Sequence, residues 1–276
     1  VNYNRFDPFY DIGLFAIKNK SVYKKPYVIR IGGIFFDKKS TKFNTQKENN
    51  IIFNGIQNSN GVIFISEFTK KLTKRFYSNF NKPNIVINNS VPLNSFKPQG
   101  NNKRNQLKIQ NNEFVILASG NWRRHKRLEE IIIFFKKISK KYSNLKLLIL
   151  GEIQENKKIK EKSIIYAGNI NHKFLPEWYR TGNLYIHLPW IDQNANTHVE
   201  ATACGLPSIC SNNGGNREII EICKSGLVSR TDKDYDYNLI DFYNPPEPNY
   251  EVLEKDFLKI YNNYESFKSK INYEPI

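Results

Sequence analysis

The chain has 276 residues and carries 42 Lys and Arg against 26 Asp and Glu, which gives a formal net charge of +16. Hydrophobic residues make up 39%, enough for a buried core, and no apolar run approaches the ~18 residues of a membrane-spanning helix. The three cysteines, Cys204, Cys210 and Cys223, lack metal-site spacing, so we expect reduced thiols, a cytoplasmic location and no bound metal.

Short apolar runs rich in β-branched residues recur along the chain. In order they are Tyr27–Ile31, Val62–Ile65, Asn84–Ile87, Phe114–Ala118, Leu145–Leu150, Ile164–Ala167, Leu184–His187 and Ser208–Cys210. Most are continuously apolar, which is typical of strands buried on both faces of a parallel sheet. The clearest helix is predicted over Lys126–Tyr142, with one apolar and one basic face. The alternation predicts an α/β fold with right-handed crossovers.

Two polar segments that contain proline interrupt this alternation, Pro98–Asn112 and Tyr243–Asn249. They predict a short N-terminal domain over residues 1–97, a linker over 98–112 and a second α/β domain over 113–245. The remaining residues, 246–276, contain an amphipathic helix that we expect to return to the N-terminal domain.

The first candidate site directly follows the predicted strand Phe114–Ala118. It combines a glycine with four cations: Gly120, Arg123, Arg124, Lys126 and Arg127. Backbone N–H groups at a helix start attract anions, and added cations make a diphosphate the natural ligand. A solvated basic turn is the alternative interpretation.

The second candidate site follows the strand Leu184–His187 and carries two carboxylates, Asp192 and Glu200. Glu200 has two interpretations. It closes a capping box that starts at Thr197, or it accepts hydrogen bonds from vicinal hydroxyls, as carboxylates do in ribose recognition. Of the nearby histidines, we expect His187 to lie in the core and His198 to be exposed.

Two glycine pairs also follow predicted strands. Gly214–Gly215 permits either close approach of the backbone to a ligand or a plain tight turn. Gly32–Gly33, in the N-terminal half, is a weaker signal of the same kind.

Taken together and in order, these segments resemble the retaining glycosyltransferases of family 4, which have the GT-B fold. The similarity runs from about Tyr27 to Val228. It includes an N-domain strand that ends in Ser, an interdomain crossover, an Arg/Lys diphosphate motif, an E-x7-E-like acidic motif and a closing Gly-Gly-x-x-Glu. These are Gly61–Phe68, Ile85–Pro98, Trp122–Arg127, Asp192–Glu200 with its continuation to Pro207, and Gly214–Glu218.

The chain departs from the family pattern in three respects. Its basic motif is compressed, so that either Arg123 or Arg124 takes the role of the family's arginine, and we expect Arg123 to do so. Its first acid is Asp192, one methylene shorter than Glu, as in a subset of the family. Its N-terminal half is short: the family's first strand and glycine loop are missing, and Gly32 or Gly33 stands where the family has a His. We expect Tyr10–Phe15 to match a middle strand of that domain, and the chain to be either a minimal enzyme or a reading frame that lacks its start.

The resemblance implies two Rossmann-like domains that face each other across a cleft. It implies metal-independent transfer of a sugar from a nucleotide-diphosphate sugar to an acceptor hydroxyl with retention, and no cofactor besides that donor. Arg123 and Lys126 would bind the departing diphosphate, Glu200 the ribose, and Asp192 the donor sugar. Further donor contacts would come from Gly120, Gly168, Ile170, Asn196 and Thr197, and the acceptor side from Gly32 and Gly33.

The resemblance implies a glycan, a lipid-linked molecule or a small molecule as acceptor. The excess of Lys and Arg over Asp and Glu also predicts peripheral contact with an anionic membrane. The alternative interpretation is that an AT-rich genome has raised the Lys content. The alternative functions are a non-enzymatic, basic nucleic-acid-binding protein and an inactive remnant that binds the donor. Nucleic acid is the weaker option because carboxylates at strand ends would repel phosphates.

Overall fold

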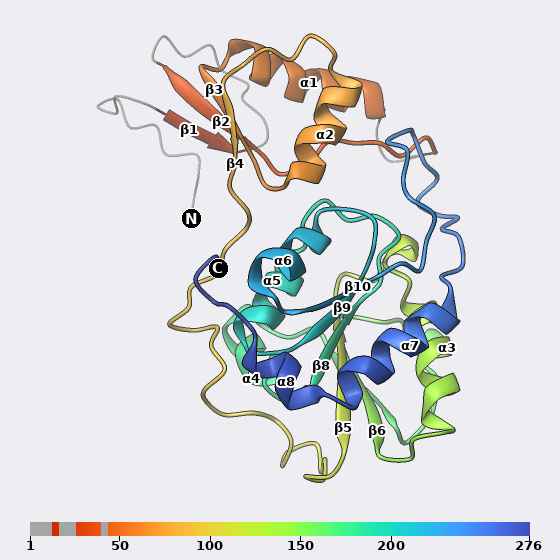
Figure 1. Ribbon diagram of the computed structural model, residues 1–276. Coiled ribbons are helices and arrows are strands. Elements are labelled where there is room, and N and C mark those ends of the chain that lie inside the picture. Colours follow the sequence, from red (N-terminus) through yellow and green to blue (C-terminus); the bar gives the residue numbers. More distant parts are fainter. Residues whose placement is uncertain (1–12, 17–25, 40–43) are drawn as a thin grey trace. The chain divides into compact units, whose positions relative to one another are not determined.

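The computed structural model describes residues 13–16, 26–39 and 44–276, and the chain forms two compact units (Figure 1). Unit 1 comprises Val1–Asn89 and Tyr235–Phe242, and unit 2 comprises Ser90–Asp234 and Tyr243–Ile276. The chain passes from unit 1 to unit 2 inside the segment Ile85–Pro98, which resembles the interdomain crossover.

Unit 1 contains a parallel four-stranded sheet in the order β1 (Gly13–Ala16), β2 (Tyr27–Ile31), β3 (Gly61–Phe64) and β4 (Asn84–Val86). Helices α1 (Thr45–Asn58) and α2 (Glu67–Phe76) follow β2 and β3, and right-handed crossovers place both on one face of the sheet (Figure 1). The predicted strand Tyr10–Phe15 overlaps β1, but Tyr10–Ile12 lies outside the described residues.

The segment Tyr235–Phe242 belongs to unit 1 because it pairs and packs there. Ile240 forms a parallel bridge with Asp37, and the ring of Phe36 meets that of Phe242 edge-on at 4.9 Å. No feature of the sequence pointed to this return of the chain.

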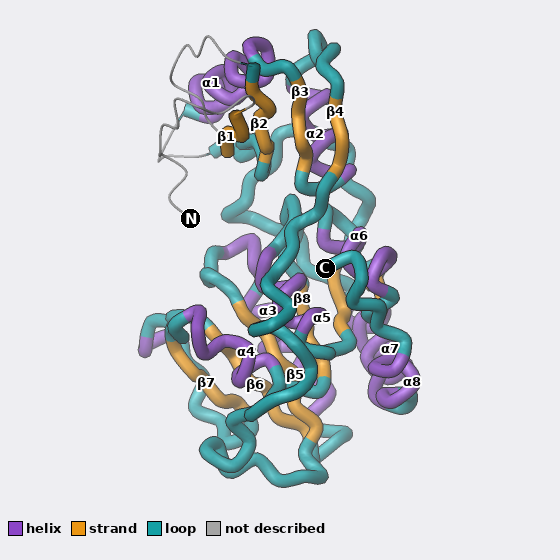
Figure 2. Tube along the Cα trace, turned by 90° about the vertical axis from the view of Figure 1, so that its left-hand side faces the viewer, coloured by secondary structure: helices purple, strands orange, loops and turns teal. Residues whose placement is uncertain are grey.

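Unit 2 contains a parallel six-stranded sheet in the order β10-β9-β8-β5-β6-β7. Figure 2 shows the part of this sheet formed by β8, β5, β6 and β7. Its strands are β5 (Phe114–Ser119), β6 (Leu145–Leu150), β7 (Ile164–Gly168), β8 (Leu184–His187), β9 (Ser208–Ser211) and β10 (Gly226–Ser229). Its helices are α3 (Leu128–Ser139), α4 (Leu175–Tyr179), α5 (Asn196–Ala203), α6 (Asn216–Cys223), α7 (Tyr250–Tyr261) and α8 (Tyr264–Ser269), with 3-10 turns η1 (Arg124–Lys126), η2 (Glu155–Lys157) and η3 (His172–Phe174).

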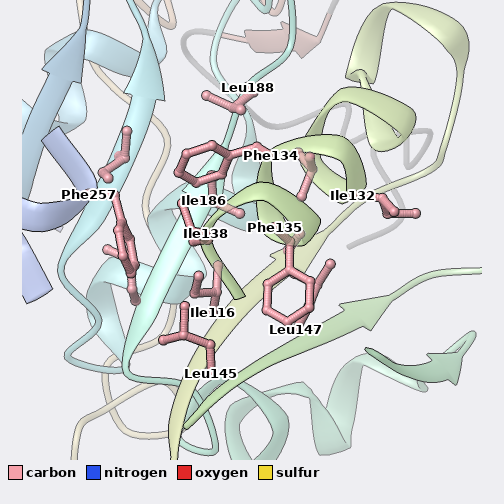
Figure 3. Packing of buried hydrophobic residues seen from close by; sticks show 14 of the residues in the cluster. Ile116, Ile132, Phe134, Phe135, Ile138, Leu145, Leu147, Ile186, Leu188 and Phe257 are labelled. Atoms are coloured by element: carbon pink, nitrogen blue, oxygen red, sulfur yellow. The ribbon is translucent and has the colours of Figure 1, made fainter. Parts of the chain in front are cut away.

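Both faces of the central strands are buried, as their continuous apolar runs predict. Along β5, Phe114, Ile116 and Ala118 face one cluster, and Val115 and Leu117 face another. Helices α3 and α7 cover the first face, where Phe134 and Phe257 pack near Ile186 (Figure 3), and α4 and α5 contribute to the second. This double cover fixes the sheet whose ends carry the candidate site.

Two predictions about domain organisation need correction. The C-terminal helix α7 packs against α3 and β10 of unit 2, through Leu253, Phe257 and Ile260, and does not return to the N-terminal unit. The predicted linker 98–112 is also part of unit 2, because the backbone N–H of Lys103 donates to Thr181 Oγ1 (2.9 Å) and Ile109 is buried. The polar composition of residues 98–112 predicted a linker because it gave no sign of the contacts that Lys103 and Ile109 make with unit 2.

Candidate functional site

The candidate site lies at the carboxyl ends of β5 and β8. From β5 the chain adds β6 and β7 on one side, and then returns to add β8, β9 and β10 on the other. Ligands of open parallel sheets bind in the crevice at such a reversal. The strand ends here are Ser119 and His187, and the predicted basic and acidic segments follow them directly.

The basic segment uses two of its cations for structure. Arg127 has a left-handed conformation (φ 57°) and is completely buried, and it forms two hydrogen bonds to the Asp232 carboxylate, at 2.6 and 2.9 Å. Arg124 forms an ion pair with Glu130 at 2.6 Å. Helix α3 therefore begins at Leu128, after η1, and not at Lys126 as predicted. Arg123 is exposed and forms no ion pair with the described residues, so it remains for a ligand.

Lys126 forms an ion pair with Asp192, which joins the two predicted sites. The Asp192 side chain is only 14% exposed, and the Nε2 atom of His187 lies 3.8 Å from its Oδ2. Burial alone would raise the pKa of Asp192, but the Lys126 ammonium, aided by His187, outweighs it and holds that pKa below its usual range. Asp192 is therefore a carboxylate at neutral pH.

The Gly214–Gly215 pair holds the loop that carries Asp192. Gly214 has φ 102° and bridges to Asp192, and the N–H of Gly215 donates to the Asp192 carbonyl oxygen at 2.8 Å. A Cβ atom at Gly214 would lie 2.1 Å from that carbonyl oxygen, so only glycine fits. The close approach is thus to the protein's own backbone.

Glu200 lies on α5 with both carboxylate oxygens hydrogen-bonded. Its Oε2 accepts a hydrogen bond from the Tyr179 hydroxyl (2.9 Å), and its Oε1 lies 3.1 Å from His172 Nε2. The Glu200 side chain is 6% exposed, whereas that of His172 is 67% exposed. The Glu200 carboxylate is therefore held at Oε2 by a buried hydroxyl, whereas its hydrogen-bond partner at Oε1 among the described residues is the largely exposed ring of His172.

Buried hydroxyl groups extend this arrangement toward the strand ends. Ser119 Oγ lies 3.0 Å from the Tyr179 hydroxyl and 3.1 Å from the Tyr185 hydroxyl, which donates to Thr197 Oγ1 at 3.1 Å. Sequence reasoning missed this network. The one signal for it was the presence of tyrosines in otherwise apolar, buried segments, whose hydroxyls need partners.

The capping-box interpretation of Glu200 is wrong. Helix α5 is capped at Ala195 and begins at Asn196, so Thr197 is already inside the helix and makes no capping hydrogen bond. His198 is completely buried, contrary to expectation, and its Nε2 lies 2.9 Å from Ser208 Oγ. His187 is buried as predicted.

The buried imidazoles of the site are held neutral. Burial lowers the pKa of His187 and, more strongly, that of His198. His125, on η1, has a pKa of about 4 because burial and the nearby Lys126 charge both disfavour its protonation. The positive charge of the site at neutral pH therefore comes from Lys126 and Arg123.

The other predicted contact residues fall in three places. Gly120 directly follows β5, and Asn196 and Thr197 begin α5. Gly168 (φ 70°) ends β7, two strands from the switch, and Ile170 follows it. Gly32 and Gly33 follow β2 in unit 1.

The described residues contain neither a cluster of metal ligands nor a membrane-spanning helix. No group of three or more His, Cys, Asp or Glu side chains there is arranged to hold a metal ion. Among the described helices, none combines the length and apolar character needed to span a membrane.

Comparison with known families identifies the class of protein. The sequence model of the glycosyl transferases group 1 matches residues 99–240, more than half of the chain, and the chain belongs to this family. The nucleic-acid-binding alternative is therefore not favoured.

Among curated proteins, a putative glycosyltransferase of Bacillus subtilis, YtcC, is 24% identical over 267 residues, 87% of this chain and 61% of that protein. The chain spans between 47% and 61% of the length of three curated relatives that it matches.

Two solved structures show the fold. Sucrose-phosphate synthase from Thermosynechococcus elongatus is similar at TM-score 0.68 with 16% identity, over 90% of this chain and 61% of its own. Anabaena HepE, solved in complex with UDP-glucose, is similar at TM-score 0.61 with 16% identity, over 90% of this chain and 66% of its own. The chain therefore has the parallel-sheet α/β architecture of GT-B glycosyltransferases, as the sequence predicted.

Proposed function

We propose that this glycosyltransferase moves a sugar from a nucleotide-diphosphate sugar to an acceptor hydroxyl with retention at the anomeric carbon. The observation that carries the proposal is the Lys126–Asp192 ion pair at the carboxyl ends of β5 and β8, with Glu200 on helix α5, which follows β8. Anabaena HepE, of similar fold, was solved with a donor of this class.

Arg123 and Lys126 would stabilise the departing nucleoside diphosphate. Negative charge grows on the oxygen that bridges phosphate and sugar as the glycosidic bond breaks. Cations already in place at that oxygen stabilise the transition state more than the ground state. Arg123 is exposed and unpaired among the described residues, and Lys126 is held in place by Asp192.

Glu200 would accept hydrogen bonds from the ribose hydroxyls of the donor. Tyr179 holds one carboxylate oxygen from the buried side, which fixes the orientation of the group before a ligand binds. The other oxygen is hydrogen-bonded only to His172 among the described residues, and this side chain is largely exposed, so a ribose would replace that contact.

Asp192 would accept hydrogen bonds from the donor sugar. Its charge is shared with Lys126, and a carboxylate with a lowered pKa is a poor nucleophile and a poor base. In the proposed reaction the acceptor oxygen bonds to the anomeric carbon on the face that the diphosphate leaves. The bond from that carbon to the phosphate oxygen breaks, and the acceptor proton passes to that oxygen. No metal ion takes part in these steps.

The acceptor is proposed to be a glycan, a lipid-linked molecule or a small molecule that approaches Gly32 and Gly33 of unit 1. A cytoplasmic location is proposed as well. It is supported by the three cysteines, which are free and buried in the structure.

Thermal-shift screening of the full chain with UDP, GDP, ADP and CDP sugars tests the proposal. Sugar nucleotides with one of these bases should raise the melting temperature of the chain, and the increase should grow with the logarithm of ligand concentration. NMR of the product formed from that donor should then show the anomeric configuration of the donor. Absence of stabilisation by every sugar nucleotide would contradict the proposal, and stabilisation without transfer to any acceptor would identify an inactive remnant.

A further inference from the structure

Unit 1 contains a cavity of about 760 Å³ that takes no part in the site described above. Its wall consists of one side of α1, the end of α2 at Phe76 and Tyr77, and the neighbouring residues Asp37, Lys38 and Leu239. The volume lies in the range of roughly 300–1,000 Å³ that is typical of ligand sites. All of its lining residues belong to unit 1, whereas Arg123, Lys126, Asp192 and Glu200 belong to unit 2.

A stripe of carboxamides runs along the cavity side of α1. Its members follow one another at helical spacing, and all are exposed: Gln46, Asn50, Asn54 and Gln57. None of these four side chains hydrogen-bonds to another described residue. Each carboxamide offers both a donor and an acceptor, the combination that hydroxyl groups of a sugar require.

Two further amides of the lining, Asn44 and Asn49, differ from these four because their side chains already form hydrogen bonds within the protein. The Asn44 side chain caps α1 by accepting from Lys47 N, and Asn49 is buried with both of its polar atoms bonded to the backbone of Phe35. The cavity lining therefore contains two amides that stabilise the fold and four exposed amides without hydrogen bonds to other described residues.

An aromatic pair provides the apolar part of the cavity. Phe53, in the middle of the amide stripe, stacks on Tyr77 with ring centroids 4.8 Å apart and an interplanar angle of 9°. Both rings are half-buried, so each keeps a surface for a ligand. Aromatic rings of this kind pack against the C–H face of a sugar while neighbouring amides bind its hydroxyls.

The charge of the lining argues for a neutral ligand. In a chain of net charge +16, this lining contains one acid, Asp37, and one base, Lys38. Asp37 is buried, and its Oδ1 accepts from the backbone N–H of Lys39 at 3.1 Å. An anionic ligand would find no excess of cations here.

We infer that this cavity binds a segment of a neutral oligosaccharide, with Asn50, Asn54 and Gln57 on its hydroxyls and the Phe53–Tyr77 pair beneath a sugar ring. It is a glycan site separate from the nucleotide-sugar site of unit 2. It would hold a carbohydrate chain on the enzyme by contacts that do not take part in sugar transfer.

Calorimetric titration of the full chain with maltohexaose, cellohexaose and chitohexaose tests the inference. The wild type should bind at least one of the three. The double variant Asn50→Ala/Asn54→Ala should weaken that binding by about tenfold or more. Alanine favours helix more than asparagine does, so α1 should keep its stability. Asn58→Ala is the matched control, because Asn58 lies on the same helix outside the cavity lining.

The inference is overturned if none of the three hexasaccharides binds, or if the double variant binds as tightly as the wild type. Titration of the same samples with the sugar nucleotide found by thermal shift separates this result from the proposed function. The double variant should keep full affinity for the donor. A chain that binds the donor and no oligosaccharide refutes the cavity assignment alone.

Discussion

The two units are built on the same parallel strand–helix plan, yet their polar side chains are used differently. In unit 2 the strand order reverses at β5, and cations, carboxylates and imidazoles gather at that reversal. In unit 1 the described strands lie in sequence order without a reversal, and its cavity is lined mainly by uncharged side chains, many of them amides along a helix. The comparison teaches that topology, more than composition, decides where charged chemistry collects.

The two units also differ in how much free energy their polar side chains cost the folded state. Buried charge in unit 2 must be paired, since an unpaired buried ion is strongly destabilising. The exposed amides of α1 in unit 1 remain hydrated and cost little. Substitutions in unit 2 should therefore have the larger effects.

The largest effect is expected for Arg127→Ala. It leaves the buried Asp232 carboxylate without a cation and without the two hydrogen bonds that Arg127 donates, which should cost unit 2 about 3–5 kcal/mol of unfolding free energy. Urea denaturation measures the change. The exposed Arg230→Ala should stay within about 0.5 kcal/mol of the wild type. Equal stability of the two variants would show that the Arg127 pair is not structural.

Lys126→Ala and Arg123→Ala should each reduce turnover by about 10²–10³, in line with the loss of one preorganised group at the developing charge. Steady-state kinetics with the identified donor gives the effect. Lys136→Ala, on the exposed side of α3, is the control and should keep wild-type turnover. Wild-type turnover in both site variants would remove the diphosphate assignment.

Acid should destabilise unit 2 through its buried imidazoles. Below pH 6.5 the unfolded chain protonates His125, but the folded chain does so only near its pKa of about 4. The contribution of the neutral His125 to the unfolding free energy is therefore complete above pH 6.5, and it falls by up to about 3 kcal/mol as the pH drops to 4. The lowered pKa values of His187 and His198 act in the same direction.

Urea midpoints at pH 7.5, 6 and 5 measure this loss. His125→Gln should show a shallower fall than the wild type over the same range. A midpoint independent of pH would mean that these imidazoles are not held neutral by the fold.

Sequence patterns predicted the sheets well because burial on both faces leaves a local signature. Tyr27–Ile31, Leu145–Leu150 and Leu184–His187 form strands with the predicted bounds. The strand β10 (Gly226–Ser229) was missed, because a short run beside Ser225 and Gly226 carries little apolar signal. Helix α3 was predicted two residues too early, since spacing does not reveal a left-handed Arg127.

The candidate site was only partly predictable. The order of the sequence segments singled out Lys126, Asp192 and Glu200, which the structure brings to neighbouring strand ends. The partners of these residues were not predictable, since Lys126 and Asp192 are 66 positions apart, and Tyr179 and Glu200 are 21 apart. Contacts of this range depend on how the strands are ordered.

The smallest effect is expected for contact with membranes, which remains a prediction. On α2, Lys70 pairs with Glu67 at 3.3 Å and Lys74 lies over Phe80, while Lys71 is exposed. Each free cation near an anionic surface contributes about 1 kcal/mol, so binding should be weak.

Vesicle sedimentation should show binding to anionic but not neutral vesicles at low salt, and release at physiological salt, where the screening length is ~8 Å. Replacing Lys70, Lys71 and Lys74 by Glu should abolish that binding and leave donor affinity unchanged. Failure of the wild type to bind anionic vesicles at low salt would favour a soluble acceptor.

The central claim, that unit 2 holds the donor at the β5–β8 switch, is tested most directly by calorimetric titration of Glu200→Gln with the nucleoside diphosphate of the preferred base. Glutamine can keep hydrogen bonds to Tyr179 and His172, and α5 does not depend on Glu200 for capping, so the fold should be retained. Loss of the charge-assisted hydrogen bonds to ribose should cost about 1.5–3 kcal/mol, or about 10-fold to 150-fold in affinity. Unchanged affinity in a folded Glu200→Gln variant would contradict the claim.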